Sequence, residues 1–275
     1  MSQDEARFPR IIEAQALSAH LEAPDLLIID VPANAQSYRD GHVPGAIFLD
    51  YRRLLSGQPP VANDVPDEAA LSTLFSELGL TPKTHVIVYD DEGGGWAGRL
   101  AWTLTLLGHD QWSYLNGGIH AWKGENLPVA TDETAPTPSH YDARIERPAL
   151  IIRREELIER LEDPTLAIWD ARSPDEYDGL KGNNQRLGHI PGAVNLDWIK
   201  TMDQGRQLRL RDLSELMGDL VAMGIDAESE IATHCQSHHR SGLTWMIGHT
   251  LGYNIRAYPG SWQEWGNRDD TPIET

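Results

Sequence analysis

Cysteine is nearly absent from this chain of 275 residues, which holds a single one, Cys235. One cysteine excludes an internal disulfide and any metal site built from several cysteines. Long hydrophobic runs are also missing, since no stretch approaches the roughly 20 apolar residues that cross a bilayer. The start, Met1–Phe8, shows no basic segment followed by an apolar one, so no secretory signal is expected. These absences predict a reducing, cytoplasmic location.

Positive charge is scarce, with 23 Lys and Arg against 42 Asp and Glu and a formal net charge of -19. A chain this acidic repels phosphate backbones and anionic lipid headgroups, so neither nucleic acid nor a membrane is expected as a partner. Solubility and small-molecule chemistry are favoured instead. The length exceeds that of a typical single domain and predicts two domains of ordinary size.

The one cysteine lies among cationic and polar side chains. The run Thr233–Gly242 reads Thr-His-Cys-Gln-Ser-His-His-Arg-Ser-Gly, with no carboxylate. Nearby positive charge favours a thiolate, so Cys235 is predicted to be a nucleophile. A buried structural cysteine is the alternative, and the consecutive polar residues after Cys235 argue against it. The histidines lack the paired spacing of structural zinc sites, so no metal is predicted.

The sequence repeats itself once. The apolar run Leu26–Asp30 followed by Gly41–Ala46 returns in the same order as Leu166–Asp170 followed by Gly188–Ala193. The second segment of each pair reads Gly-His-Val-Pro-Gly-Ala in the first copy and Gly-His-Ile-Pro-Gly-Ala in the second. A match of this length, preceded by matched apolar runs, predicts duplicated domains.

The duplication places Asp90 at the position of the cysteine, because His85–Asp90 aligns with Glu230–Cys235. The first copy has Gly93–Gly95 where the second has His238–Arg240, so it lacks both the nucleophile and the cations. The first copy is therefore predicted to be catalytically silent. A Pro- and Thr-rich stretch without apolar periodicity separates the copies and predicts a linker. The predicted boundaries are residues 1–130 for the silent domain, 131–143 for the linker and 144–275 for the catalytic domain.

Within each copy, short β-rich runs alternate with helical patterns. This alternation predicts an α/β fold, an open and mainly parallel sheet flanked by helices. After Cys235, Leu243, Met246, Ile247 and Leu251 recur at helical spacing, so the order is strand, cysteine loop, helix. The carboxyl end of a parallel strand and the unpaired N–H groups of the next helix form a crevice suited to anions. Cys235 is predicted to lie in that crevice.

These features resemble the rhodanese family: the two Gly-His-X-Pro-Gly-Ala segments, the strand-to-cysteine loop and the silent first copy. The resemblance covers nearly the whole chain, and the cysteine loop is similar to that of bacterial tandem-domain thiosulfate:cyanide sulfurtransferases. It implies that Cys235 takes the outer sulfur of thiosulfate as a persulfide, releases sulfite, and passes the sulfur to cyanide or a thiol acceptor without a cofactor. It also implies that Asp90 marks an inactivated catalytic position. The implied anion cradle consists of Gln236, Ser237, His238, His239, Arg240 and Ser241.

Three other activities are alternatives. A persulfide carrier that delivers sulfur to a protein acceptor needs the same cysteine. A 3-mercaptopyruvate sulfurtransferase has a loop resembling Cys-Gly-(Ser/Ala)-Gly-Val-Thr, which this loop does not match. A Cdc25-like phosphatase carries five residues between its cysteine and arginine, whereas four separate Cys235 from Arg240. A phosphoryl group needs the wider loop, so this alternative is disfavoured.

Candidate substrate contacts follow from the resemblance. The second copy has seven more residues than the first between its aspartate and its Gly-His segment, and this insertion carries Lys181 and Arg186. Family members place substrate-contacting cations here, although a solvated loop is the alternative, favoured for Lys181. Trp198 is expected near the mouth of the site, with simple packing as its alternative. Glu176 departs from the arginine that relatives have shortly before the aromatic residue.

Two structural expectations complete the sequence-based description. Arg172 follows Asp170 by two residues at a strand end, and an ion pair that supports the fold is favoured over a substrate contact. Two fused copies satisfy each other's contacts, so a monomer is expected.

Overall fold

The computed structural model describes residues 8–275, and its helices and strands group into two units. Unit 1 comprises the described residues up to Leu54 together with Pro66–Arg147 and Gln204–Arg209. Unit 2 comprises Leu55–Val65, Pro148–Asp203 and Leu210–Thr275. The predicted boundaries of the silent domain, the linker and the catalytic domain stay a prediction.

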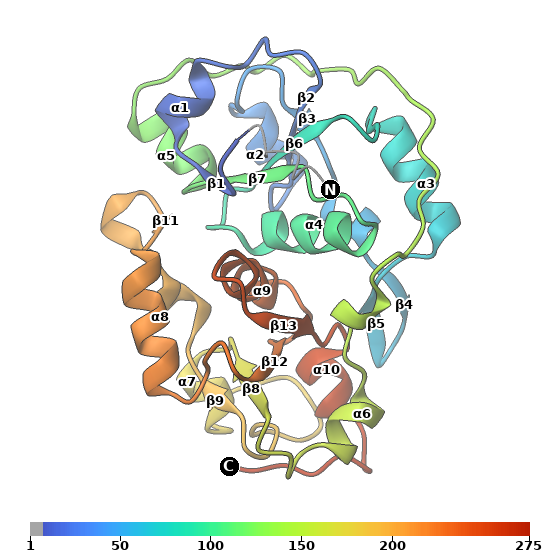
Figure 1. The fold of residues 1–275 in the computed structure, drawn as a ribbon, viewed down its shortest axis with the longest axis vertical. Helices are drawn as coiled ribbons and strands as arrows, with labels where there is room; N and C mark the ends of the chain where they lie inside the picture. Colours follow the sequence, from blue (N-terminus) through green and yellow to red (C-terminus); the bar gives the residue numbers. More distant parts are fainter. Residues whose placement is uncertain (1–7) are drawn as a thin grey trace. The chain divides into compact units, whose positions relative to one another are not determined.

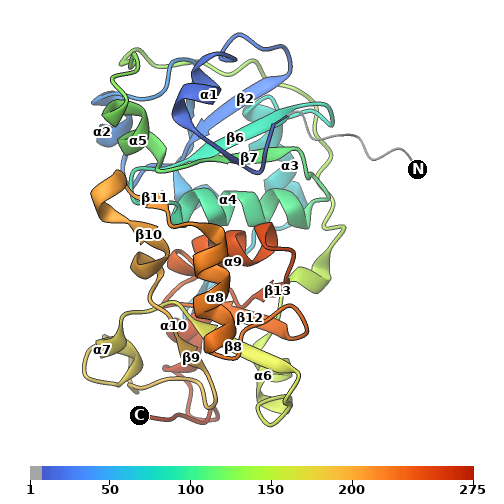
Figure 2. The ribbon, with the colours of Figure 1, turned by 60° about the vertical axis from the view of Figure 1, so that its left-hand side comes forward.

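Unit 1 is built on a parallel five-stranded sheet of order β1-β7-β6-β2-β3. All five residues of the central strand β6 are buried, as is usual for a strand covered on both faces. Figure 2 shows α1 and α5 on one side of this sheet and α4 on the other. The strands are β1 (Ile11–Ile12), β2 (Leu26–Asp30), β3 (Ile47–Phe48), β6 (His85–Tyr89) and β7 (Trp112–Leu115). The helices are α1 (Ala14–Ser18), α2 (Ala35–Arg39), the 3₁₀ turn η1 (Tyr51–Leu54), α3 (Glu68–Glu77), α4 (Gly95–Leu106) and α5 (Gly118–Gly124).

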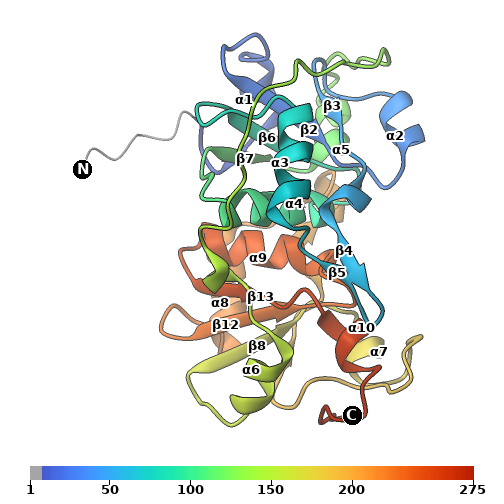
Figure 3. The same ribbon diagram turned by 90° about the vertical axis from the view of Figure 1, so that its right-hand side faces the viewer.

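Unit 2 repeats this plan with a parallel four-stranded sheet of order β13-β12-β8-β9. Helix α9 packs against β12 and β13 (Figures 1 and 3). The strands are β8 (Leu166–Asp170), β9 (Val194–Asn195), β12 (Glu230–His234) and β13 (Asn254–Ala257). The helices are η2 (Pro148–Leu150), α6 (Arg154–Glu159), α7 (Pro174–Tyr177), η3 (Trp198–Thr201), α8 (Leu213–Ala222), α9 (Arg240–Thr250) and α10 (Ser261–Trp265), while η4 (Gln204–Arg206) belongs to unit 1. Two small two-stranded sheets pair β4 (Ser56–Gln58) with β5 (Val61–Asp64), and β10 (Met202–Asp203) with β11 (Arg209–Leu210).

The two sheets confirm the predicted α/β fold and its duplication. Register shows the repeat directly, since Asp30 lies opposite Tyr89 at the end of one strand pair and Asp170 lies opposite His234 in the other. The loops after β6 and β12 therefore begin at equivalent places. Within residues 8–275, no helix is both long enough and apolar enough to cross a membrane.

Candidate active site

Cys235 follows the last residue of β12 and precedes α9, as the sequence predicts. Strand β12 is held on both sides by parallel neighbours, β8 and β13, so the start of the loop is fixed. The apolar side chains Leu243 and Ile247 are buried and fix α9 on the far side of the loop. Cys235 itself has no exposed surface.

The sulfur of Cys235 receives two hydrogen bonds from its own loop. The Ser237 backbone N–H and the Ser241 hydroxyl each lie 3.5 Å from Sγ. Burial on its own raises the pKa of the thiol, but the positive charge of Arg240 and the hydrogen bonds from Ser241 and Ser237 outweigh it and lower the pKa below its ordinary value. This environment favours the thiolate, which is the reactive form of cysteine.

The loop is shaped by two residues in the left-handed conformation. His238 has a φ of 52° and Ser261, at the start of α10, also has a φ of 52°. The Ser261 hydroxyl accepts the N–H of His238 at 3.0 Å and that of Cys235 at 3.4 Å, and donates to the Tyr258 carbonyl at 2.9 Å. Non-glycine residues pay a conformational cost at positive φ, and such residues concentrate at functional sites.

Arg240 is fixed by Glu176 on α7. The two side chains form a bidentate ion pair with N–O distances of 2.6 and 2.9 Å. Burial raises the pKa of the Glu176 carboxyl, but the hydrogen bond and charge of Arg240 dominate and hold that pKa at about 2. The same pair raises the pKa of Arg240 against the effect of burial. Ser173 completes a capping box with Glu176 and so orients α7.

A second ion pair lies at the end of β8. Arg172 binds the Asp170 carboxylate, with its Nη2 at 2.6 Å from Oδ2, and both side chains are buried. Arg172 also donates to the Gly188 carbonyl at 2.8 Å and lies 4.4 Å from the ring of Trp262. The predicted structural ion pair is confirmed. His234 lies 3.6 Å from Asp170, and burial lowers the pKa of His234 despite this carboxylate.

The insertion in the second copy contacts the loop through Asn184. The Gln236 amide donates to Asn184 Oδ1 at 2.9 Å, and the Asn184 amide donates to the Trp262 carbonyl at 3.1 Å. Arg186 instead donates to the carbonyls of Thr271 and Trp265 at 2.8 and 3.1 Å. Its guanidinium therefore binds the C-terminal segment.

Lys181 is exposed, and its backbone N–H donates to the Asp175 carbonyl at 3.0 Å. Trp198 is half-buried, and its ring lies 5.6 Å from that of His239. Within residues 8–275, the structure thus brings Trp198 to the loop, whereas the hydrogen bonds of Lys181 and Arg186 are made to other segments.

Three residues that contribute to the site were not assigned to it from the sequence: Glu176, Asn184 and Ser261. Glu176 stood out only as a departure from relatives, although its spacing from Ser173 is that of a capping box. Ser261 aligns with Gly118 of the first copy, and this change from glycine to serine was the available signal.

The equivalent loop of unit 1 is organised around the Asp90 carboxylate. Oδ1 accepts the N–H groups of Glu92, Gly93 and Gly94 at 3.0, 3.0 and 2.8 Å, and Oδ2 accepts that of Ala97 at 3.0 Å. Asp90 is fully buried. The loop after β6 therefore binds an anion supplied by its own chain.

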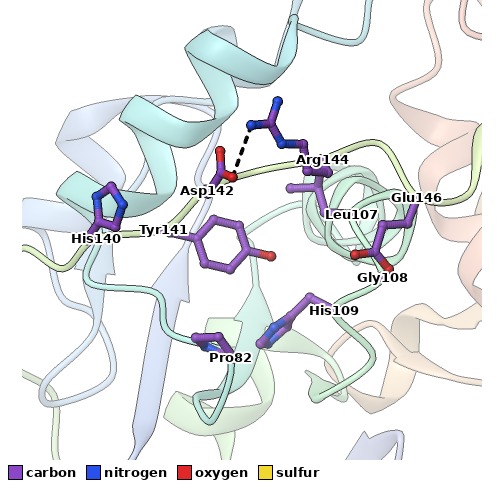
Figure 4. Close-up of a pocket in the computed structure, with 9 residues that line it drawn as sticks. All are labelled: Pro82, Leu107, Gly108, His109, His140, Tyr141, Asp142, Arg144 and Glu146. Atoms are coloured by element: carbon purple, nitrogen blue, oxygen red, sulfur yellow. Dashed lines mark hydrogen bonds and ion pairs between the residues drawn. The ribbon is translucent and has the colours of Figure 1, made fainter.

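A separate pocket of about 370 Å³ lies in unit 1 and involves no residue of the Cys235 loop (Figure 4). It is lined by Pro82, Leu107, Gly108, His109, His140, Tyr141, Asp142, Arg144 and Glu146. Arg144 is paired with Asp142 at 3.1 Å and with Glu68 at 3.2 Å. Within residues 8–275, no group of three or more His, Cys, Asp or Glu side chains is arranged to hold a metal ion.

Comparison with known proteins places the chain in a family. A profile described as "Rhodanese-like domain" matches residues 13–125 and again residues 153–268. The thiosulfate sulfurtransferase of Azotobacter vinelandii is 47% identical over 98% of this chain and 99% of its own length. That of Pseudomonas aeruginosa is 44% identical over 97% of each chain.

The solved structures agree on the fold. The anaerobic ergothioneine biosynthesis enzyme from Chlorobium limicola superposes with a TM-score of 0.86 at 21% identity, over 97% of this chain and 70% of that one. Identity this low supports the shared fold alone. With two profile matches and relatives above 40% identity over nearly its full length, the chain belongs to the family of rhodanese-like domain proteins, with one such domain in each half.

Proposed function

We propose that this protein is a thiosulfate sulfurtransferase in which Cys235 carries the transferred sulfur as a persulfide. The observation that carries the proposal is the environment of Sγ, a buried sulfur with a lowered pKa that accepts hydrogen bonds from Ser237 and Ser241. The similarity to two thiosulfate sulfurtransferases supports thiosulfate as the donor. Cyanide or another thiophile is the acceptor.

The reaction has two displacement steps. The Cys235 thiolate attacks the outer sulfur of thiosulfate, a new S–S bond forms, and the old one breaks with its electron pair leaving on sulfite. The carbon of cyanide then attacks the outer persulfide sulfur, thiocyanate leaves, and the thiolate is regenerated. Donors that stabilise the thiolate also stabilise the terminal persulfide charge, because both are sulfur anions in one loop.

The anion cradle is proposed to consist of the residues from Gln236 to Ser241. Arg240 contributes positive charge close to Cys235 in a chain whose net charge of -19 repels a dianion. Trp198, which lies beside His239, is proposed to border the site. Arg186 and Lys181 stay predictions as substrate contacts. Unit 1, with Asp90 in place of cysteine, is proposed to be catalytically silent.

The test is thiocyanate formation from thiosulfate and cyanide by the purified protein. Wild type is expected to turn over, and Cys235→Ala is expected to be inactive. Intact mass after incubation with thiosulfate alone should show the gain of one sulfur atom, removable by cyanide. Wild-type turnover equal to that of Cys235→Ala would reject the proposal. Faster reaction with 3-mercaptopyruvate, transfer only to a protein acceptor, or hydrolysis of an aryl phosphate would each identify the corresponding alternative.

We also propose that the protein works as a monomer in the cytoplasm. The proposed chemistry needs Cys235 as a free thiol, and reducing compartments keep thiols in that form. Sedimentation of the purified protein and fractionation of the cells that make it test these two points.

A further inference from the structure

We propose that His238 is the proton acceptor for Cys235 and acts through the hydroxyl of Ser241. The three side chains form a chain of contacts, with His238 Nδ1 at 2.8 Å from Ser241 Oγ, and Ser241 Oγ at 3.5 Å from Cys235 Sγ. All three residues are fully buried. The resting nucleophile is then a thiolate paired with an imidazolium. This inference rests on the proposed function only for the identity of the substrate that the thiolate attacks.

The backbone holds His238 in the position that this role needs. Its φ of 52° is uncommon for a residue other than glycine, and its N–H is bound by Ser261 Oγ at 3.0 Å. Ser261 carries the same unfavourable φ in order to supply that oxygen. In unit 1 the corresponding stretch is glycine, which adopts positive φ without this cost. A histidine kept at a position suited to glycine indicates that its side chain is required there.

The proton moves in two linked transfers that balance. The S–H bond of Cys235 breaks as its proton passes to Ser241 Oγ, and the Ser241 O–H bond breaks as its own proton passes to His238 Nδ1. The products are a Cys235 thiolate, an unchanged Ser241 hydroxyl and a His238 imidazolium. Ser241 then donates to the thiolate and accepts from His238, so both hydrogen bonds are retained and become charge-assisted.

The thiolate and the imidazolium lie among two ion pairs and several further titratable groups. Arg240 is paired with Glu176, and Arg172 is paired with Asp170, while the charge of Arg240 still lowers the pKa of Cys235. Burial raises the pKa of Asp197, and burial lowers the pKa of His234. The titratable and charged groups packed around the loop are Asp170, Arg172, Glu176, Asp197, His234, His239, Arg240 and Tyr258.

The test is the pH dependence of Cys235 alkylation by iodoacetamide between about pH 5 and 10, with thiolate absorbance recorded in parallel. Wild type should show two inflections, one for formation of the thiolate beside imidazolium and one for loss of the imidazolium proton. Ser241→Ala should show one inflection, with the thiolate midpoint about one pH unit higher, because it loses a hydrogen bond to a charged group. At pH 7 its alkylation should be roughly tenfold slower.

His238→Asn separates proton transfer from hydrogen bonding. Asparagine tolerates positive φ and offers an amide N–H near the place of Nδ1, but it takes up no proton. We expect a folded variant with a single inflection at higher pH. Ser113→Ala in unit 1 is the matched control, because it removes a buried serine–histidine hydrogen bond outside the Cys235 loop, between Ser113 Oγ and His85 Nε2 at 2.8 Å, and the two-step profile should persist.

Two results would overturn the inference. One is a pH profile of alkylation that keeps both inflections in His238→Asn. The other is a thiolate midpoint in Ser241→Ala that equals that of wild type. Alkylation needs no sulfur donor. A wild-type protein that shows the two steps but forms no thiocyanate would therefore contradict the proposed function alone. Thermal unfolding of each variant establishes that the fold is intact.

Discussion

The loops after β6 and after β12 begin at equivalent points of two related sheets, yet they hold different anions. The Asp90 carboxylate accepts four backbone N–H groups at 2.8 to 3.0 Å. The Cys235 sulfur accepts two hydrogen bonds at 3.5 Å. The bonds to sulfur are longer because sulfur is the larger atom, and in both loops N–H or O–H donors of the chain stabilise an anion at the end of the strand. One loop geometry thus supports structure in unit 1 and chemistry in unit 2.

The residues that follow Asp90 and Cys235 also differ between the two loops. Gly93 and Gly94 adopt positive φ in unit 1, where backbone N–H groups do the binding. In unit 2 the equivalent positions bring side chains with ionisable groups, and His238 accepts the conformational cost. Arg240 adds a charge that unit 1 lacks at this place. The two loops therefore differ in the side chains they carry, while both have positive φ at the third residue after Asp90 or Cys235.

The largest effect on activity is expected when Cys235 is replaced by aspartate, the residue at the equivalent position of unit 1. Cys235→Asp should lower thiocyanate formation by at least about 10³-fold, because a carboxylate supplies no sulfur nucleophile. The fold should be kept, since Asp90 shows that this loop type accommodates a buried carboxylate. The converse double variant, Asp90→Cys with Cys235→Ala, should be inactive. Measurable turnover by that variant would show that unit 1 is not intrinsically silent.

Removing the internal anion of unit 1 should cost stability rather than activity. Asp90→Ala leaves four backbone N–H groups, three of them on buried residues, without their acceptor and should lower the free energy of unfolding by about 3 kcal/mol. Urea denaturation followed by tryptophan fluorescence measures this change. Asp132→Ala, at an exposed position of the same unit, is the control and should change stability by less than about 0.5 kcal/mol. Equal effects of the two substitutions would show that the carboxylate is not what holds the loop.

The Glu176–Arg240 pair has no equivalent in the silent loop and should make unit 2 sensitive to acid. The folded-state pKa of Glu176 is about 2 and its ordinary value is 4.5. A carboxyl group with a depressed pKa contributes stability that is complete above its unfolded value and is lost as pH falls through the folded value. Between about pH 4.5 and 2, the free energy of unfolding of wild type should therefore fall by about 2 kcal/mol through protonation of Glu176. Glu176→Gln lacks this contribution already at neutral pH and should show no such fall.

Urea titrations at several pH values test this dependence, with Glu159→Gln on the exposed part of α6 as the control. The stability of Glu176→Gln should fall less steeply with acid than that of wild type or of the control. The same slope in all three proteins would show that the ion pair does not contribute. Because Arg240 loses its anchor, kcat/KM for thiosulfate should also fall, by roughly tenfold.

Much of this organisation follows from local sequence. Strand-length apolar runs, the helical spacing after Cys235 and the internal repeat are enough to predict the α/β fold and the place of the cysteine loop. The partners of the loop are not local. Glu176 meets Arg240 across 64 residues, and Ser261 binds His238 across 23. Neither contact has a spacing rule, because each depends on which loops the folded sheet brings together.

Ser261 offers the smallest and most specific test of how the two loops diverged. Its hydroxyl stabilises the Cys235 loop, but its φ of 52° is costly, and unit 1 has Gly118 at the equivalent position. Ser261→Ala loses the hydroxyl and keeps the conformational cost, so the free energy of unfolding should fall by about 1 to 2 kcal/mol. Ser261→Gly loses the same hydroxyl but removes the cost of positive φ, so its loss should be smaller by up to about 1 kcal/mol. Gly118 has a further reason to be glycine, because a Cβ there would lie 2.2 Å from the Asp90 carbonyl oxygen. If Ser261→Gly were instead the more damaging substitution, relief of backbone strain would not operate at Ser261, and the serine would have to contribute through packing of its side chain.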